Sequence, residues 1–510
     1  MADVVIGSGP SGIAAASALV AQGRKVILLD GGGRPSPGDE ARREAMASSS
    51  PDDWTPADRD GWRAAQYAAP PGQVRRFGSD FAMEPEAATF DGAGGIALRA
   101  SRAEGGLSNL WGAAVLPYSP HDTRDWPVSP AEMAPHYRAV AALLPIAGQP
   151  DDLEALFPSV PMRGRQPLDP SPQAGELMAR LGRRRDRLRA LGVTVGAARQ
   201  AVGDGCRACA MCLHGCPWGL IWSARRSIAD LAPVVDHRPG QVALALAEDA
   251  AGVTVTLAGG ETLRCGRVFV AAGVLETARI MLASFPALEV VTLRDSQQAF
   301  LPMLTGWRSR PRPDSARLHT LAQIFAEIDD PRISPRLVHA QIYTWNDFYR
   351  RDLLQRFGRL PFAPTVLDAL SLRLVVAQMF LHSDHSARLV LRLGRDGRLG
   401  ATVGTNAETG QVTGRALKRL ARAFRAAGLI PLTPASRRGT PGSGFHAGAS
   451  FPIRPGGGPG ASDILGRPLG LKRVHLVDAS SLPAIPATTI TLGVMANAHR
   501  IADWTARAEA

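Results

Sequence analysis

Residues 3–30 read DVVIGSGPSGIAAASALVAQGRKVILLD and contain the strongest fold signal in the chain. The two apolar ends, the glycine-rich turn and the alanine-rich middle predict a strand, a turn, a helix and a second strand. In this context Gly7 permits the tight turn, Gly9 lets a pyrophosphate approach the backbone, and Gly12 lets the helix pack closely. Asp30, 18 residues beyond Gly12, ends the second strand, where its carboxylate can accept hydrogen bonds from an adenosine ribose. The stretch therefore predicts a Rossmann-type dinucleotide site with phosphates at the helix N-terminus.

The motif alone leaves the bound nucleotide open. We favour FAD, and NAD or a glycine turn without any ligand are the alternatives.

Chain length and composition limit the class of protein. The 510 residues, 45% of them apolar, predict a large core and two to three domains. The longest apolar stretch, Leu370–Leu381, is interrupted by Arg373 and Gln378 and is shorter than the roughly 20 residues of a membrane-spanning helix. The chain is already strand-like at Asp3, which leaves no room for a secretory leader before the fold. We therefore expect a soluble protein without a transmembrane segment. Closely spaced cysteines favour a reducing, cytoplasmic compartment, although a companion chain could carry the folded protein elsewhere.

The formal net charge is +12, but the basic residues are nearly all arginines and only three are lysines. Such a skew is typical of codon bias, so we predict no nucleic-acid partner. The densest basic run, Arg183–Arg187, lies among leucines between Leu177 and Leu191 that are spaced along one helix face. We interpret the arginines as the solvated side of that helix. The alternative is a docking surface for an acidic partner such as a ferredoxin or a cytochrome.

Four of the five cysteines lie in the segment CRACAMCLHGCPWG. Their spacing, C-x2-C-x2-C-x3-C followed by proline, is that of bacterial ferredoxin loops. The predicted ligands are Cys206, Cys209, Cys212 and Cys216. Structural zinc usually takes two separated cysteine pairs, so the pattern favours an iron–sulfur cluster. Zinc, disulfides and an empty relic of a cluster loop are the alternatives.

The type of cluster is open on the sequence. In ferredoxins with two clusters the fourth cysteine of this run ligates the other cluster, and the chain has no second run. Either Cys216 closes a 4Fe–4S site, which we favour, or the cluster is 3Fe–4S. Cys265 lies in a strand-like segment and is predicted to be a buried small hydrophobe.

Four further segments resemble, in order along the chain, the glucose-methanol-choline (GMC) oxidoreductase family. EGGLSNLWG at 104–112 resembles the glycine-rich flavin-contacting segment of that family, and VFVAAGVLETARIMLAS at 268–284 resembles its second signature. GFHAGASFP places His446 at the position of the active-site histidine of the family. RVHLVDASSLPAIPATTITLGVMANAHRIA resembles the C-terminal strand, loop and helix that close over the flavin.

The resemblance implies an α/β fold, in which a discontinuous Rossmann-type FAD-binding domain is interleaved with a sheet-based α+β substrate domain. We expect the FAD-binding domain at 1–128, at 201–290 with the cysteine loop, and at 441–510. The substrate or cap domain is expected at 129–200 and 291–440.

The resemblance also implies a set of site residues. The flavin contacts beyond the glycine turn would be Gly106, Ser108, Asn109, Trp111, Gly112, Ala272, Gly273, Asp478, Ala479, Thr488 and Thr489. Members of the family typically oxidise an alcohol by removing its proton and transferring hydride to the flavin. His446 would be the base, because a neutral imidazole can accept a hydroxyl proton near neutral pH. A helix starting near Ala487 would direct backbone N–H groups at the flavin and stabilise its reduced form.

One position departs from the family pattern. Where the family commonly has His or Asn before a proline, this chain has Ile485, whose side chain cannot form a hydrogen bond. Either another residue of the substrate domain assists His446, or the reaction differs from plain alcohol oxidation. A structural role for His446 is the alternative. Asn497 and His499, further along the C-terminal helix, are interpreted as surface or packing residues.

The region from 286 to 440 matches the family weakly and is expected to form the substrate walls. Its polar candidates are Tyr343, Trp345, Asn346 and His382, and each is interpreted as part of the scaffold, with a substrate contact as the alternative. These residues lie on segments that alternate like strands. The stretch Phe348–Leu381 is amphipathic and is predicted to be a core helix, with a lid or a lipid-facing surface as alternatives. Residues 34–75, rich in Pro, Ser, Asp and Arg, are predicted to form a long surface excursion that could cover the FAD.

The leading functional hypothesis is an FAD-dependent dehydrogenase that oxidises a hydroxyl group. Single electrons would pass through the cluster to an external carrier such as a ferredoxin or a cytochrome. A sugar or glycoside is favoured as the substrate because related cluster-bearing members of the family act on sugars, which is an inference from resemblance. The alternatives are an oxygen-using oxidase with a structural cysteine loop, an enzyme that runs reductively, and an electron-transfer subunit without catalysis.

Overall fold

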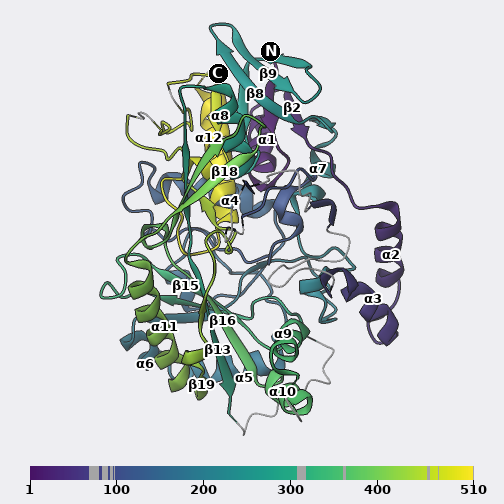
Figure 1. Ribbon diagram of the computed structural model, residues 1–510, viewed down its shortest axis with the longest axis vertical. Helices are drawn as coiled ribbons and strands as arrows, with labels where there is room; N and C mark the ends of the chain where they lie inside the picture. Colours follow the sequence, from purple (N-terminus) through teal and green to yellow (C-terminus); the bar gives the residue numbers. More distant parts are fainter. Residues whose placement is uncertain are drawn as a thin grey trace.

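The computed structural model describes residues 1–67, 80–82, 90, 91, 96, 98–306, 318–359, 363–456, 460–468 and 470–508. The molecule is elongated and has two parts (Figure 1). One part carries both chain termini and a parallel sheet, and the other contains a large antiparallel sheet.

The first part is built on a five-stranded parallel sheet with the order β22–β11–β1–β2–β7. Its strands are β1 (Asp3–Ile6), β2 (Val26–Asp30), β7 (Asp236–Pro239), β11 (Arg267–Val270) and β22 (Val474–Leu476). Every residue of β1, β11 and β22 is buried. This is the expected state of central parallel strands that are covered on both faces.

Different elements cover the two faces of the parallel sheet. On one face Val5 and Phe269 pack against helices α1 (Pro10–Ala21), α4 (Pro130–Ala142) and α12 (Thr491–Arg507). On the other face Val4 and Val268 pack against α8 (Val274–Ser284) and a small sheet of β8 (Ala243–Asp249), β9 (Gly252–Leu257) and β10 (Thr262–Cys265). Cys265 is 1% exposed in this second core, which confirms the prediction of a buried small hydrophobe.

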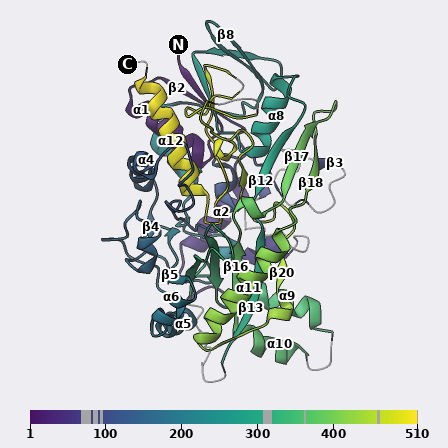
Figure 2. The ribbon, with the colours of Figure 1, turned by 90° about the vertical axis from the view of Figure 1, so that its left-hand side faces the viewer.

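The second part is built on a seven-stranded antiparallel sheet. Its strands are, in spatial order, β19 (Leu429–Pro431), β13 (Gln298–Thr305), β16 (Leu374–Phe380), β15 (Val338–Tyr343), β14 (Ile324–Ile328) and β5 (Val193–Ala197), with β20 (Arg437–Arg438) beside β13. Alternate apolar residues such as Ala340 and Ile342 contact α5 (Pro172–Gly182), α6 (Arg185–Ala190) and α11 (Thr409–Ala426) on one face (Figure 2). The intervening residues, such as His339 and Gln341, therefore point to the opposite face.

Smaller elements complete the fold. A third sheet has the order β21 (Ala447–Gly448), β12 (Val291–Asp295), β17 (Arg388–Leu393), β18 (Leu399–Gly404) and β3 (Phe90–Asp91), and β4 (Ile146–Ala147) pairs with β6 (Gln200–Ala201). Among the described residues the other α-helices are α2 (Pro37–Ala47), α3 (Pro56–Tyr67), α7 (Ala224–Leu231), α9 (Asp347–Phe357) and α10 (Ala363–Ser371). Short 3₁₀ helices are at Asp80–Ala82, Gly106–Asn109, Asp152–Ala155, Cys212–His214, Ser383–His385, Thr433–Ala435 and Ala479–Ser481.

Two expectations about helices need correction. The leucine pattern from Leu177 to Leu191 forms two helices, because α5 ends at Gly182 before α6 begins at Arg185. The arginines between 183 and 187 are exposed, which confirms the solvated face. The stretch Phe348–Leu381 is not one core helix, since it contains α9, α10 and then the strand β16. The sequence of β16, LVVAQMF, has the β-branched residues that favour a strand. None of the helices within the described ranges is long and apolar enough to cross a bilayer.

Candidate functional site

The glycine turn between β1 and α1 lies at the carboxyl edge of the parallel sheet. The helix α1 begins at Pro10, directly after the N-cap residue Gly9. A Cβ atom at Gly12 would lie 1.8 Å from the carbonyl oxygen of Gly7, so only glycine permits this close approach of helix and turn. A Cβ atom at Gly9 would meet no protein atom within 4 Å. The turn is therefore packed at Gly12 and open at Gly9, as a phosphate cradle requires.

Asp30 ends β2 beside this turn, and both of its carboxylate oxygens have partners within the protein. Oδ2 accepts hydrogen bonds from the backbone N–H of Ser8, at 3.2 Å, and from the Ser8 hydroxyl. Oδ1 accepts from the backbone N–H of Gly32 at 2.6 Å. Burial raises the pKa of the Asp30 carboxyl, and the hydrogen bond from Ser8 opposes that rise. A ribose hydroxyl at this carboxylate would have to share it with these groups, which the two lone pairs on each oxygen permit.

The segment EGGLSNLWG packs directly on the glycine turn. A Cβ atom at Gly106 would lie 3.6 Å from the Cα of Gly9. The backbone N–H of Gly105 donates to the Ser8 hydroxyl oxygen at 2.9 Å. The sequence-predicted segments at 7–12 and 104–112 are therefore brought together.

Side chains of this segment fix its shape. The Ser108 hydroxyl and the Asn109 amide donate to backbone carbonyls of the same segment, at 2.6 and 2.8 Å. The indole N–H of Trp111 donates to the carbonyl of Trp222 at 2.7 Å. A Cβ atom at Gly112 would lie 3.8 Å from the Tyr343 hydroxyl, which borders this loop from the second part of the molecule.

Two more predicted segments end at the same edge of the parallel sheet. Ala272 and Gly273 follow β11, and Gly273 is the N-cap residue of α8. Asp478 follows β22, and its carboxylate accepts from the Thr277 hydroxyl of α8 at 2.5 Å. Burial raises the pKa of the Asp478 carboxyl. This side chain therefore ties the end of β22 to the first turn of α8.

The last predicted segment lies before α12, which begins at Thr491 and not at Ala487. Thr488 is fully buried, and the Thr489 hydroxyl oxygen accepts from the backbone N–H of Leu116 at 2.8 Å. The carbonyl of Ala479 accepts from the backbone N–H of Ala449 at 2.8 Å, which joins this region to the loop that contains His446.

His446 lies between the exposed residue Phe445 and strand β21. Its carbonyl accepts from the backbone N–H of Ser296 at 2.9 Å, and its ring stacks on Phe380 with centroids 4.9 Å apart. Its Nδ1 atom is buried and has no hydrogen-bond partner in the described part of the chain. Burial, with a smaller contribution from His339, lowers the pKa of His446 to about 3. The imidazole is therefore neutral at pH 7 and can accept a proton.

Ile485 does not reach any polar site. It is fully buried in an apolar cluster with Tyr118, Ala449 and Val494. Its backbone N–H donates to the Ser383 hydroxyl oxygen at 3.1 Å. The structure therefore supplies no hydrogen-bonding side chain at the position of the second family residue.

The four candidate wall residues have different surroundings. The Tyr343 hydroxyl donates to the Gln341 side chain at 2.9 Å. Asn346 caps α9, and His382 caps the 3₁₀ helix at Ser383–His385, so both stabilise local structure. Trp345 is half-buried, and its indole nitrogen has no hydrogen-bond partner among the residues described here. Tyr343 alone of the four is placed against the segment 104–112.

Asn497 and His499 are packing residues. The Asn497 amide donates to the Ser481 hydroxyl at 3.2 Å, and the ring of His499 contacts that of His136.

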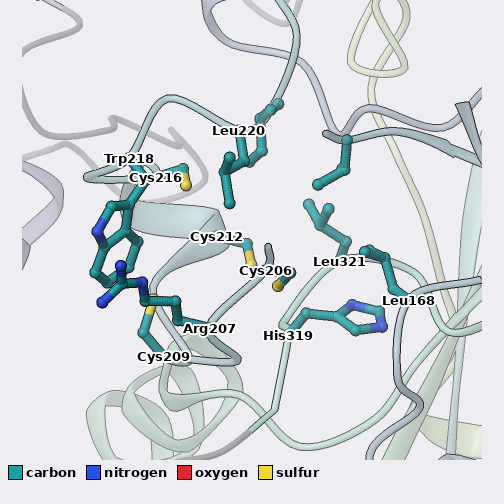
Figure 3. A pocket seen from close by; sticks show the side chains of 12 residues that line it. Leu168, Cys206, Arg207, Cys209, Cys212, Cys216, Trp218, Leu220, His319 and Leu321 are labelled. Atoms are coloured by element: carbon teal, nitrogen blue, oxygen red, sulfur yellow. The ribbon is translucent and has the colours of Figure 1, made fainter. Parts of the chain in front are cut away.

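The four clustered cysteines line one pocket (Figure 3). The pocket is lined by Leu168, Val202, Cys206, Arg207, Cys209, Cys212, Cys216, Trp218, Leu220, Ile221, His319 and Leu321. Cys212 also packs against Ala113, which directly follows the segment 104–112. The pocket therefore lies next to the loop that contacts the glycine turn.

The thiols of this pocket are free. All five cysteines of the chain lack a disulfide partner. Burial raises the pKa of Cys209 to about 12, so this thiol is protonated at pH 7. In the described ranges, no three His, Cys, Asp or Glu side chains converge closely enough to hold a metal ion. The sequence-predicted ligands thus share a pocket without forming a closed coordination shell.

The excursion predicted for 34–75 covers the cysteine loop. The Trp62 indole of α3 donates to the Gly215 carbonyl at 3.1 Å. The Trp218 indole donates to the Ala47 carbonyl of α2 at 2.9 Å, and its ring stacks on Trp54 with centroids 5.4 Å apart. Residues 68–75 of the excursion lie outside the described residues.

No family model and no curated protein matches the chain. Solved structures match along its full length. Pyridoxine 4-oxidase from Mesorbium loti gives a TM-score of 0.62 over 99% of this chain and 98% of that chain, at 16% identity. A formate oxidase gives 0.60 over 99% and 98% of the two chains, at 12% identity. A variant of the Aspergillus oryzae RIB40 formate oxidase, in which FAD modification was examined, gives 0.57 at 13% identity over the same shares.

The chain has the fold of these oxidases. This confirms the predicted α/β fold class, with a Rossmann-type domain of the FAD-binding kind and a sheet-rich second domain. The likeness extends over nearly the whole of each chain, so it covers both parts of the molecule and not the nucleotide motif alone.

Within this oxidase fold, backbone strain is concentrated in three of the predicted site segments. Five non-glycine residues of the described chain have a positive φ, and they are Ala113, Ala208, Ala210, Phe445 and Ala449. One follows the segment 104–112, two lie in the cysteine loop, and two flank His446 within three residues. Such conformations cost about 1–3 kcal/mol each and are concentrated at functional sites.

Sequence reasoning missed two polar residues of the second part. Glu327 and His339 are fully buried on β14 and β15, and the His339 Nδ1 lies 2.6 Å from a Glu327 carboxylate oxygen. A signal was present, because a Glu in IFAEI and a His in VHAQIY interrupt otherwise apolar strands. Their pairing depends on strand register, which the sequence did not supply.

Proposed function

We propose that the chain is an FAD-dependent oxidoreductase that removes hydrogen from a hydroxyl-bearing substrate, with His446 as the base. The observation that carries this proposal is the position of His446. A neutral imidazole lies in a loop hydrogen-bonded to Ala479, next to the edge where the predicted flavin segments converge.

The residues at the glycine turn fit an FAD. The open space at Gly9 suits a pyrophosphate, and the N-terminus of α1 offers backbone N–H groups to it. We assign the remaining contacts to the loop of Gly106, the turn at Gly273 and the buried threonines before α12. The FAD-binding parts would then be 1–128, 201–290 and 441–510, as expected from the resemblance.

Bound FAD would supply a hydride acceptor. His446 would take the hydroxyl proton, and burial keeps its imidazole unprotonated and ready to do so. The amides of Gln341 and Gln378 lie on the face of β15 and β16 that carries His339 and Phe380. Such neutral polar groups suit a substrate with several hydroxyl groups, which supports the proposal of a sugar or glycoside.

The test is anaerobic reduction of the flavin by sugars and polyols, measured as the loss of visible flavin absorption. His446→Ala should slow the reduction roughly a hundredfold or more, because general-base catalysis contributes that much. His385→Ala is the matched control, since that buried histidine bonds to Ser334 outside the predicted flavin segments. Equal reduction rates in wild type and His446→Ala would overturn the assignment of the base.

We propose further that the cysteine loop holds an iron–sulfur cluster. The ferredoxin-type spacing, the common pocket and the strained Ala208 and Ala210 support this. Because the thiols form no closed shell, binding would require them to lose protons and move together. Cluster ligation would involve the four cysteines of the pocket, and their place beside Ala113 suits single-electron exchange with the flavin.

Iron and sulfide content with an electron-paramagnetic spectrum tests the cluster. Cys212→Ser should lose most of the iron, whereas the buried control Cys265→Ser should retain it. Iron content that is the same in Cys212→Ser and in wild type would exclude ligation by this loop.

The second candidate is an oxidase that uses oxygen, and it is favoured by one observation: the proteins that share the fold are named as oxidases. Oxygen consumption and reduction of a one-electron carrier, measured side by side with the same substrate, separate the two. A carrier-dependent rate with little oxygen uptake supports the dehydrogenase, and the reverse supports the oxidase.

A further inference from the structure

The base His446 needs a partner that the family position does not supply. Ile485 is sealed in an apolar cluster, and the Nδ1 atom of His446 has no hydrogen-bond partner in the described structure. The ring of His446 instead rests on Phe380 of β16. The seven-stranded sheet therefore supplies the ring that contacts this base.

Three residues form a row across that sheet. The strand register pairs Glu327 of β14 with His339 of β15, and His339 with Phe380 of β16. All three side chains point to the face opposite α11, because the apolar core under α11 takes the alternate residues. The Phe380 ring stacks near His339 with centroids 6.3 Å apart and on His446 with centroids 4.9 Å apart. The row thus leads from a buried carboxylate to the base.

The Glu327–His339 pair is sealed from water. Both side chains are fully buried, their polar atoms are 2.6 Å apart, and the His339 Nε2 has no partner in the described part of the molecule. Glu327 also interacts electrostatically with Arg199 and Asp122. Burial raises the pKa of the Glu327 carboxyl, and His339 opposes that rise.

His339 is the member of the pair that lies next to Phe380, and Glu327 lies one strand further away. Electrostatic interaction with His339 lowers the pKa of His446, in addition to the larger effect of burial. The pair is therefore coupled to the base both by packing through Phe380 and by charge.

We propose that Glu327 and His339 are positioning residues for His446: the pair holds Phe380 in place against the ring of the base. The inference rests on the proposed function of His446 as the base. It assigns no contact with the substrate to His339, whose side chain is fully buried.

The test compares His339→Gln, Glu327→Gln and the control His385→Gln, in which a histidine bonded through Nδ1 to Glu408 is replaced in the same way. Either change removes the contact between the carboxylate and the imidazole that fixes the row. The His446 ring resonance should therefore shift in both variants, and the pKa of His446 should rise in His339→Gln, where the group that lowers it is removed. Neither should change in the control. Phe380→Leu should change the ring environment of His446 and should slow flavin reduction.

Two readouts measure the shift. In histidine-labelled protein, with and without FAD, the His446 resonance is assigned by its loss in His446→Gln and followed against pH, with His475 as an internal reference. In the loaded His339→Gln enzyme, the pH profile of flavin reduction should move to higher pH by the same amount.

The outcomes distinguish this inference from the proposed function. An unchanged His446 ring resonance in both His339→Gln and Glu327→Gln overturns the positioning role, even if His446→Ala still abolishes reduction. If the titration moves but His446→Ala reduces flavin normally, the electrostatic coupling stands and the proposed base is wrong. Should His339→Gln fail to fold, Glu327→Gln decides, because it preserves the size and the hydrogen bond of the pair.

Discussion

Gly9 and Gly12 lie three residues apart and differ in what surrounds them. A methyl group at Gly12 would collide with the Gly7 carbonyl, whereas a methyl group at Gly9 would project into open space. Gly9→Ala should therefore fold with a thermal midpoint close to that of wild type and yet bind FAD at least tenfold more weakly. Gly12→Ala should lose stability itself. The checks are thermal unfolding without FAD and a flavin fluorescence titration. If Gly9→Ala bound FAD with normal affinity, the assignment of the phosphate site to this turn would be wrong.

Asp295 is a buried acid that supports the loop before His446. Its carboxylate accepts from the Gly442 backbone N–H at 2.9 Å, and burial raises the pKa of Asp295 from 3.8 to about 6. Because the folded protein holds this proton more tightly than the unfolded chain, the contribution of Asp295 to stability is greatest below pH 4. It is lost as the pH rises through about 6, where the buried charge costs about 3 kcal/mol.

Asp295→Asn should consequently stabilise the protein at pH 7 by about 1–2 kcal/mol. The amide oxygen keeps the bond to Gly442, and the gain is reduced because the new N–H₂ group takes the place of an oxygen that has no partner in the described structure. Chemical denaturation at pH 4 and at pH 7 measures the difference, which should shrink towards the lower pH. A difference that is independent of pH would show that Asp295 does not titrate as described.

At the scale of elements, α2 and α3 form a cover over the cysteine loop. Trp62 of α3 is 2% exposed, packs in one cluster with Cys209 and Met211, and donates to the Gly215 carbonyl. Trp62→Leu should open this cover. In Trp62→Leu protein without a cluster, alkylation of Cys209 should be at least tenfold faster than in wild type. In Trp62→Leu protein loaded with a cluster, iron should be released faster than from loaded wild type. Mass spectrometry of the alkylated peptides gives the rate for each cysteine.

Trp504→Leu on α12 is the control for this experiment, because Trp504 is partly buried far along the chain against the core of the parallel sheet. It should leave the alkylation of Cys209 unchanged. If Trp62→Leu labels no faster than wild type, then the helices do not shield the loop.

The elements near 3–30 could be predicted because local sequence determines them. Apolar strands, a glycine turn and a helix follow one another within one stretch, and each glycine has a local reason. The break between α5 and α6 and the strand β16 were missed, because amphipathic spacing of leucines or arginines does not separate a helix from a buried strand. The row of Glu327, His339 and Phe380 could not be predicted from the sequence, because only strand register brings residues 12 and 41 positions apart into contact.

The whole molecule brings distant parts of the chain to one edge. The parallel sheet takes strands from residues 3–30, 236–270 and 474–476, and the seven-stranded sheet takes one strand from 193–197 and the others from beyond residue 297. Figure 1 shows these two sheets in opposite parts of the molecule. Contacts such as Gly112 with Tyr343 and His446 with Phe380 then join the parts beside the predicted flavin segments.

This arrangement would make the proposed FAD a ligand of the folded state alone, since unfolding separates every segment of the proposed site. Each tenfold rise in free FAD above its dissociation constant should then add about 1.4 kcal/mol to the free energy of unfolding. For a chain of 510 residues that unfolds as one unit, a gain of this size in the free energy of unfolding raises the thermal midpoint by roughly 1 °C, because the entropy of unfolding is large. Scanning calorimetry of FAD-free protein at rising FAD concentrations measures the slope. Gly9→Ala should need at least tenfold more FAD for the same midpoint, and FMN, which lacks the adenosine half, should act only weakly. If the thermal midpoint of wild type did not change with FAD concentration, the cofactor would not hold these segments together.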